Sequence, residues 1–159
     1  MRKESQGISW LEVIVLIVVV VLVAGIVVPN LWKSKSEINE GSAMRSMRTI
    51  MAAEENYAQS YDTGYSQTLA TLGPAPDATP NASLAGFIDS ELAGGTKEGY
   101  TFTYTAGPAG SDGRIPTYVL TANPVNSSTG AVHYYTDQTG IVRENTQQQA
   151  TDKDKPLGG

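Results

Sequence analysis

The sequence contains no cysteine and only one histidine. The missing thiols exclude disulfides, thiolate metal sites and covalent haem attachment. The single histidine, His133, stands between Val132 and Tyr134 with no second ligand at the spacing that metal sites use. No metal site and no cofactor are therefore predicted.

Basic residues are also few. The chain has 11 Lys and Arg against 16 Asp and Glu, with a formal net charge of -5. The cations are scattered in ones and twos, whereas a protein that binds nucleic acid through phosphates gathers them into a patch. We therefore expect no nucleic-acid partner.

Residues that carry catalytic chemistry are missing as well. Serines and aspartates are plentiful, but no base stands near them to activate a nucleophile, and no glycine-rich phosphate loop is present. Asp137 to Gly140 supplies one carboxylate where a calcium loop needs several oxygen donors, so we expect a turn there. The sequence predicts that the protein is not an enzyme and has no catalytic residues.

What the chain does have is one long apolar run from Ile8 to Val28, broken only by Ser9, Glu12 and Gly25. As a helix it would span roughly the ~30 Å hydrocarbon core of a bilayer. A cleaved secretory signal has a shorter apolar region, of about 7 to 15 residues. The run therefore predicts a transmembrane helix over residues 8–29.

Glu12 is the one acidic residue in this run. An ionised side chain in a bilayer core costs at least ~2.5 kcal/mol, so its position favours a cation close by. Towards the other end, Gly25 and Pro29 predict a kink within a helix that continues, because proline removes a backbone donor and clashes with the preceding turn.

The segment Gly7-Ile8-Ser9-Trp10-Leu11-Glu12 resembles the processing and assembly signature of type IV pilins and pseudopilins. In that family a short basic leader ends in Gly, the first mature residue is apolar and the fifth is Glu. Pro29 would then be mature residue 22, where the family commonly has a proline. The departures are Ile8, Ser9 and Trp10, where Phe, Thr and Leu are more usual, and Val21, where many pilins have Gly.

The resemblance implies how residues 1–7 are processed. A prepilin peptidase would cut between Gly7 and Ile8 and methylate the new amine of Ile8. That amine has an unperturbed pKa of ~7.7 to 8.0 and is largely protonated at neutral pH. In a filament, Glu12 of one subunit would face the amine of its neighbour, and the charge pair would set the subunit register.

The rest of the chain is predicted to form a stem helix and a head. Apolar residues three or four apart predict a stem helix over residues 30–62, with Ala43, Met47, Ile50, Tyr57 and Tyr61 on the buried stripe. Glu54 falls within this stripe, and we expect it at the solvent-exposed edge. Residues 63–99 predict a connector with a short helix at 84–92, stopped by Gly94-Gly95.

Alternating patterns predict four strands in residues 100–144, at 100–104, 118–122, 131–136 and 141–143. The predicted fold class is thus α+β, with a long N-terminal helix whose second half packs on a four-stranded antiparallel sheet, as in the pilin fold. The run Gly99 to Tyr104 and the turn Asp137 to Gly140 also resemble a pilin head. Residues 145–159 have little apolar character and are expected to be a disordered tail.

The resemblance implies a pilin, the structural subunit of an extracellular filament that resembles a type IV pilus. Its partners would be copies of itself, prepilin peptidase, inner-membrane assembly machinery and, before assembly, membrane lipid. The expected localisation is the inner membrane as a single-pass precursor, then the cell surface. Two alternatives stay open: a pseudopilin of type II secretion, and a single-span anchored binding domain that never polymerises.

Overall fold

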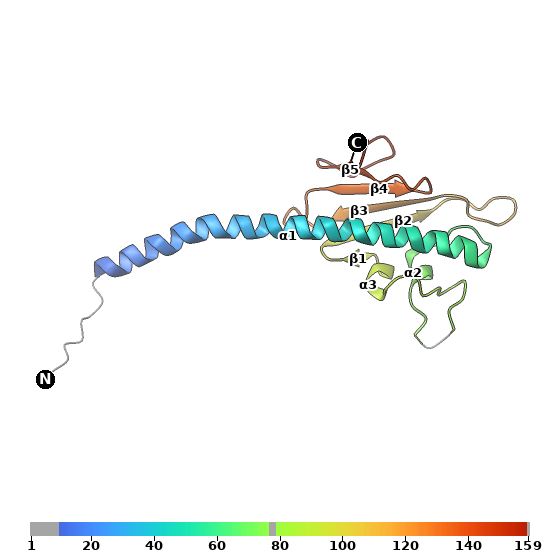
Figure 1. Cartoon of the computed structure of the whole chain (residues 1–159), viewed down its shortest axis with the longest axis horizontal. Coiled ribbons are helices and arrows are strands. Elements are labelled where there is room, and N and C mark those ends of the chain that lie inside the picture. Colours follow the sequence, from blue (N-terminus) through green and yellow to red (C-terminus); the bar gives the residue numbers. More distant parts are fainter. Residues whose placement is uncertain (1–9, 77–78, 159) are drawn as a thin grey trace. The chain divides into compact units, whose positions relative to one another are not determined.

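The computed structural model describes residues 10–76 and 79–158, and it describes no side chains for residues 24–32. The chain divides into two units, residues 1–35 and 36–159. One helix, α1 (Trp10–Tyr61), supplies the described part of the first unit and continues into the second. The elements that follow are short helices and strands of the second unit (Figure 1).

Helix α1 carries the core of the second unit because its apolar residues recur every three or four positions. Ala43, Met47, Ile50, Ala53 and Tyr57 are all buried, and none is more than 5% exposed. These residues lie on one face of a helix with 3.6 residues per turn, so one stripe meets the sheet. The helix ends before Asp62, which has φ 56, and Gly64, which has φ 74.

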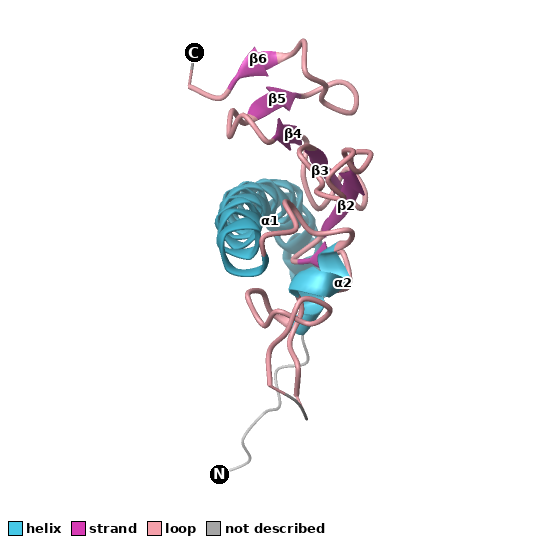
Figure 2. Cartoon of the chain, turned by 90° about the vertical axis from the view of Figure 1, so that its right-hand side faces the viewer, coloured by secondary structure: helices cyan, strands magenta, loops and turns pink. Residues whose placement is uncertain are grey.

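A six-stranded antiparallel sheet covers this stripe, with its strands in sequence order. They are β1 (Thr96–Lys97), β2 (Tyr100–Ala106), β3 (Tyr118–Pro124), β4 (His133–Asp137), β5 (Arg143–Asn145) and β6 (Lys155–Pro156). In β2 the buried Tyr100 and Phe102 alternate with exposed threonines, so one face packs on the helix and the other faces solvent. Figure 2 shows α1 end-on beside the row of strands.

Two short helices complete the second unit. Helix α2 (Leu69–Leu72) is capped by the Thr68 side chain, and α3 (Ser90–Ala93) by the Asp89 side chain. Leu69, Leu72 and Leu92 are buried in the same core as the stripe of α1. The helix predicted over 84–92 is thus much shorter, since its first residues form a loop tied to α2 by the hydrogen bond from Ala85 N–H to Thr71 O, 2.8 Å.

The prediction of four strands is wrong, because short strands add one to each edge of the sheet. At one edge, β1 and β2 form a hairpin whose two loop residues, Glu98 and Gly99, have φ 48 and 81. A two-residue loop with both φ angles positive is the turn that matches the twist of paired strands.

The other additional strand corrects the prediction of a disordered tail over residues 145–159. Residues 155–156 pair with β5, and Ala150 is only 1% exposed. The Asp154 carboxylate accepts hydrogen bonds from the Asn145 amide at 2.8 Å and from the Thr151 backbone N–H at 2.6 Å. Polar contacts, and not an apolar pattern, therefore order this segment.

The prediction of a transmembrane helix over residues 8–29 is also wrong. Crossing a bilayer takes about 20 consecutive, mainly apolar residues, and none of the helices in the described part of the chain meets this requirement. The finding contradicts both the membrane-spanning half of the predicted fold and the expected localisation as a single-pass inner-membrane precursor of a cell-surface filament.

Candidate functional site: an apolar helix surface

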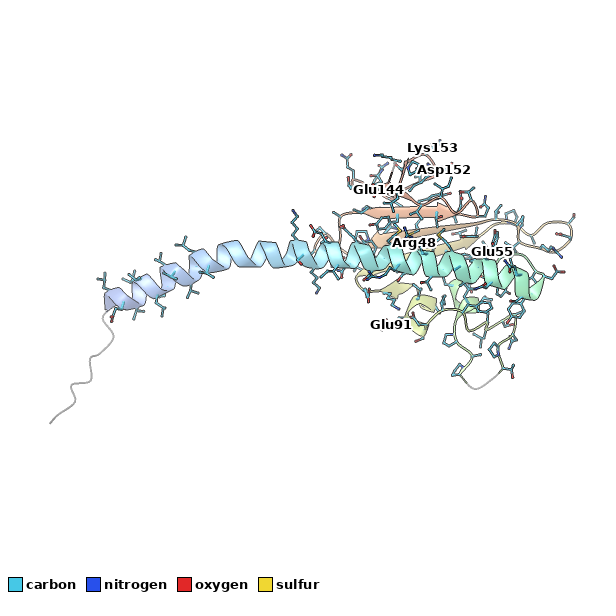
Figure 3. All side chains as sticks on the ribbon, in the orientation of Figure 1. Arg48, Glu55, Glu91, Glu144, Asp152 and Lys153 are labelled. Carbon is cyan, nitrogen blue, oxygen red and sulfur yellow. The ribbon has the colours of Figure 1, made fainter. Side chains whose placement is uncertain are left out.

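The described N-terminal part of α1 carries a continuous apolar surface. From residue 10 to residue 23 every side chain except Glu12 is apolar. All of these apolar side chains but Val13 are large exposed hydrophobics, with exposures from 41% at Ile14 to 79% at Trp10. Successive residues of a helix are about 100° apart, so this surface runs all the way around the helix. We call residues 10–23 the apolar segment; its side chains project on both sides of the ribbon in Figure 3.

The composition of the apolar segment adds a second observation. Most of its residues are Val or Ile, which lose side-chain freedom in a helix and are weaker helix formers than Ala or Leu. A helix apolar on every side is normally buried, and packing contributes most of the stability of helices in proteins. Both properties indicate a segment that functions when covered.

Glu12 belongs to this surface and is exposed. Together with Leu11, Val15, Leu16 and Val19 it lines an open groove of about 300 Å³ along one side of the helix. The spacing of three and four residues places these side chains on one face. The groove is almost wholly apolar, with a carboxylate near the N-terminal end of the segment.

The other residues singled out from the sequence are placed only in part. Gly7 and Ile8, the predicted processing site, lie outside the described residues. Gly25 and Pro29 lie within α1, which is helical at both positions, and their side chains are not described. The predicted kink therefore stays a prediction.

Glu54 is the residue whose position the sequence reasoning got wrong. Its side chain is 0% exposed, whereas the solvent-exposed edge of the stripe was expected. Its carboxyl group accepts hydrogen bonds from the backbone N–H of Ser66 at 2.8 Å and from the Ser66 hydroxyl at 2.6 Å. Burial raises the pKa of Glu54 above its ordinary value, although the two bonds from Ser66 act in the opposite direction. The sequence feature that indicated burial of Glu54 was its position within the apolar stripe.

The residues considered for metal chemistry have structural contacts. His133 Nδ1 lies 2.7 Å from the side-chain oxygen of Asn123. The Asp137 carboxylate accepts a hydrogen bond from the backbone N–H of Thr139 at 2.9 Å, which closes the turn before β5. Among the described residues, no three His, Cys, Asp or Glu side chains converge on a point where they could hold a metal ion.

Comparison with known proteins adds no assignment. No protein-family model, no curated protein and no solved structure matches this chain.

Proposed function

We propose that this chain is the structural subunit of a helical filament that resembles a type IV pilus, assembled through its N-terminal helix after the leader is removed. The observation that carries the proposal is the apolar segment, which is exposed on all sides of α1. Gly7 to Glu12, which overlap its N-terminal end, supply the resemblance to pilins.

The occupant that covers this surface is a set of further copies of the same helix. A two-fold dimer would bury one face of the segment and leave the other faces in water. A head-to-tail contact whose rotation does not close repeats indefinitely and produces an open helical array. In such an array, several neighbours surround each helix, which fits a surface that is apolar around its whole circumference.

Glu12 would set the register within this array. Cleavage after Gly7 would create a protonated amine on Ile8, and Glu12 of one copy would contact the amine of the next. When a buried ion pair loses one partner, the remaining charge is left uncompensated, which typically costs ~3 to 5 kcal/mol. Copies shifted by one turn would carry this cost, so the charge pair favours one stagger over the others.

The most direct test places aspartate on each side of the helix in turn. Ile17, Val18, Val19 and Val20 lie about 100° apart in sequence order and together sample the circumference. Each single substitution to Asp is expected to reduce filament yield at least tenfold, since an unpaired charge buried between apolar helices costs more than the ~1.4 kcal/mol that this factor represents.

Ile38→Asp is the matched control, because Ile38 lies on the same helix outside the apolar segment and is 63% exposed. Filaments would be sheared and counted in a host that has a prepilin peptidase and pilus assembly proteins. Normal yield from any one of the four variants would show that one side of the helix stays uncovered, against the proposal.

Processing and register have their own measurements. The mass of the filament subunit should correspond to a chain that begins with methylated Ile8, and filaments built from chains that still begin with Met1 would contradict the proposed processing. Glu12→Leu should lower filament yield, whereas Glu37→Leu, at an exposed position of α1 outside the apolar segment, should not.

A further inference from the structure

The second unit contains a cavity of about 320 Å³ at the end of α1. Tyr57 of α1, Tyr65 and Gln67 of the loop that follows, Thr71 of α2 and Ser83 contribute to its wall. The volume lies at the small end of the range of ~300 to 1,000 Å³ that ligand pockets occupy.

Backbone hydrogen bonds hold the wall of this cavity in place. The N–H of Tyr65 donates to Ile115 O at 2.9 Å, and the N–H of Ile115 donates to Thr63 O at 3.0 Å. In addition, the side-chain hydroxyl of Tyr57 donates to Ala82 O at 2.7 Å. The backbone of this part of the wall is thus fixed before any ligand arrives, although the cavity is open and the Gln67 and Ser83 side chains are exposed.

The lining side chains offer neutral hydrogen-bonding groups beside an aromatic ring. The Tyr65 ring packs edge-on against Tyr118, with centroids 4.8 Å apart, which fixes its orientation. Within the described part of the chain, neither the Tyr65 hydroxyl nor the Gln67 amide makes a hydrogen bond to another protein group. None of the described lining residues is Asp, Glu, Lys, Arg or His.

Charged groups of both signs stand beside the cavity, because Arg114, between the lining residues Gly113 and Ile115, pairs with Asp62. Burial and the nearby carboxyl groups of Glu55 and Glu54 raise the pKa of Tyr65 above its ordinary value. The lining has no cation to hold an anion, and the Arg114 guanidinium beside it is already paired with Asp62, so a charged ligand would gain little there. Neutral ligands rich in hydroxyl groups fit best, because they pair with amide and hydroxyl side chains and place an apolar C–H face on an aromatic ring.

We propose that this cavity is a binding site for a short neutral saccharide. The proposal does not depend on filament assembly, since every residue that carries it lies in the unit of residues 36–159. The ligand's hydroxyl groups would bond to Gln67, Tyr65 and the hydroxyl side chains of the wall, and a sugar ring would lie against Tyr65.

The test measures saccharide binding to the full chain by saturation-transfer NMR and calorimetry, in a detergent that has no sugar head group. Lactose, maltose and cellobiose are the neutral probes, and sialyllactose is the charged counterpart of lactose. At least one neutral probe is expected to bind at millimolar or lower concentration, and sialyllactose is expected to bind more weakly than lactose. If none of the neutral probes binds, or if sialyllactose binds best, the proposal is wrong.

Variants then locate the site. Gln67→Ala should weaken binding about fivefold, the equivalent of one hydrogen bond, and Tyr65→Ala up to about tenfold through loss of the ring contact. Tyr65→Phe keeps the packing on Tyr118 and should have the smaller effect of losing the hydroxyl. Gln138→Ala, at an exposed glutamine in the turn between β4 and β5, is the matched control. Equal affinity in Gln67→Ala, Tyr65→Phe and Gln138→Ala would place the sugar elsewhere and overturn the assignment.

Discussion

The buried carboxyl of Glu54 provides a sharp test of the fold, because two substitutions at this position should have opposite outcomes. The Ser66 backbone N–H and hydroxyl both donate to Glu54, and the same hydroxyl lies 3.1 Å from Thr68 O. In Glu54→Gln the amide oxygen can accept from the Ser66 N–H while the amide nitrogen donates to the Ser66 hydroxyl oxygen. The hydroxyl then donates to Thr68 O, so the backbone N–H and the hydroxyl of Ser66 both keep their partners.

Glu54→Ala removes the acceptor and leaves the backbone N–H of Ser66 buried without one. An orphaned buried donor costs ~1 to 3 kcal/mol, and the space left by the deleted side chain adds to this in a well-packed core. We expect the free energy of unfolding to fall by about 2 to 4 kcal/mol in Glu54→Ala. In Glu54→Gln it should stay within about 1 kcal/mol of the original protein at neutral pH.

The pH dependence follows from the direction of the pKa shift. Burial raises the pKa of Glu54 in the folded protein above its ordinary value of 4.5. The stabilisation that this shift represents is therefore fully present below pH 4.5 and is lost as the pH rises through the folded-state pKa. Glu54→Gln has no such titration, so its stability relative to the original protein should improve as the pH is raised from 4.5 to neutral.

Urea unfolding of the three proteins, followed by circular dichroism across this pH range, measures both effects. Ser83→Ala, at an exposed position, serves as a control that should not change stability in a pH-dependent way. Two results would refute the reasoning: Glu54→Gln destabilised as much as Glu54→Ala at neutral pH, or a difference between Glu54→Gln and the original protein that does not change with pH.

Three further outcomes test the local structure. Gly41→Ala should raise the free energy of unfolding by ~0.5 to 1 kcal/mol, because Gly41 lies inside α1 and a Cβ there would meet nothing within 4 Å; unchanged or lower stability would count against it. Gly64→Ala should lower the free energy of unfolding more than Gly140→Ala does in the same assay. The two glycines have nearly the same φ, 74 and 75, but only at Gly64 would the added Cβ clash with a backbone oxygen, that of Ile115 at 2.2 Å. Burial raises the pKa of Tyr134 to about 12, so the free energy of unfolding should fall as the pH rises from 10 towards 12. Phenolate formation is followed by ultraviolet absorbance. Complete phenolate formation over this range in a protein that is still folded would contradict the expectation.

The part of α1 that packs on the sheet could be predicted because its apolar residues are periodic. Ala43, Met47, Ile50 and Tyr57 recur at helical spacing, and all four are buried. The central strands could be predicted for the same reason, because their buried residues recur with a period of two, as Tyr100 and Phe102 do. Periodicity reports which face is buried, and it does so without knowledge of the partner surface.

The edges of the sheet could not be predicted in this way, because two-residue strands have no period. The hairpin before Tyr100 depends on Glu98 adopting a positive φ, a conformation that Asn or Asp adopts more readily. The last strand depends on Asp154, whose contacts with Asn145 and Thr151 are visible only once the chain is folded. Low hydrophobicity indicated disorder, yet a polar network ordered the segment.

Glu54 shows why a rule based on residue type failed in the core. Glutamates are almost never fully buried unless they are paired, which is why the exposed edge was expected. Its partners come from Ser66, on the loop after α1, and the sequence gives no sign that this loop folds back onto the helix. A carboxylate inside an apolar stripe is thus better interpreted as a buried group with hydrogen-bond donors close by than as a sign that the stripe is exposed at that position.

The two units differ in whether the chain itself covers their apolar surface, and this difference bears on the proposed function. In residues 36–159 the apolar stripe of α1 is covered by the chain's own sheet, so this unit needs no other protein to complete its core. The apolar segment of residues 10–23 has the opposite character, because it is exposed in the described structure and is built from weak helix formers. The chain completes one core by itself and leaves a second apolar surface on the same helix. Burial of this second surface contributes stability only when other molecules cover it. If those molecules are copies of itself, the concentration of subunits controls both assembly and the order of the segment, and helicity of residues 10–23 should rise with filament formation.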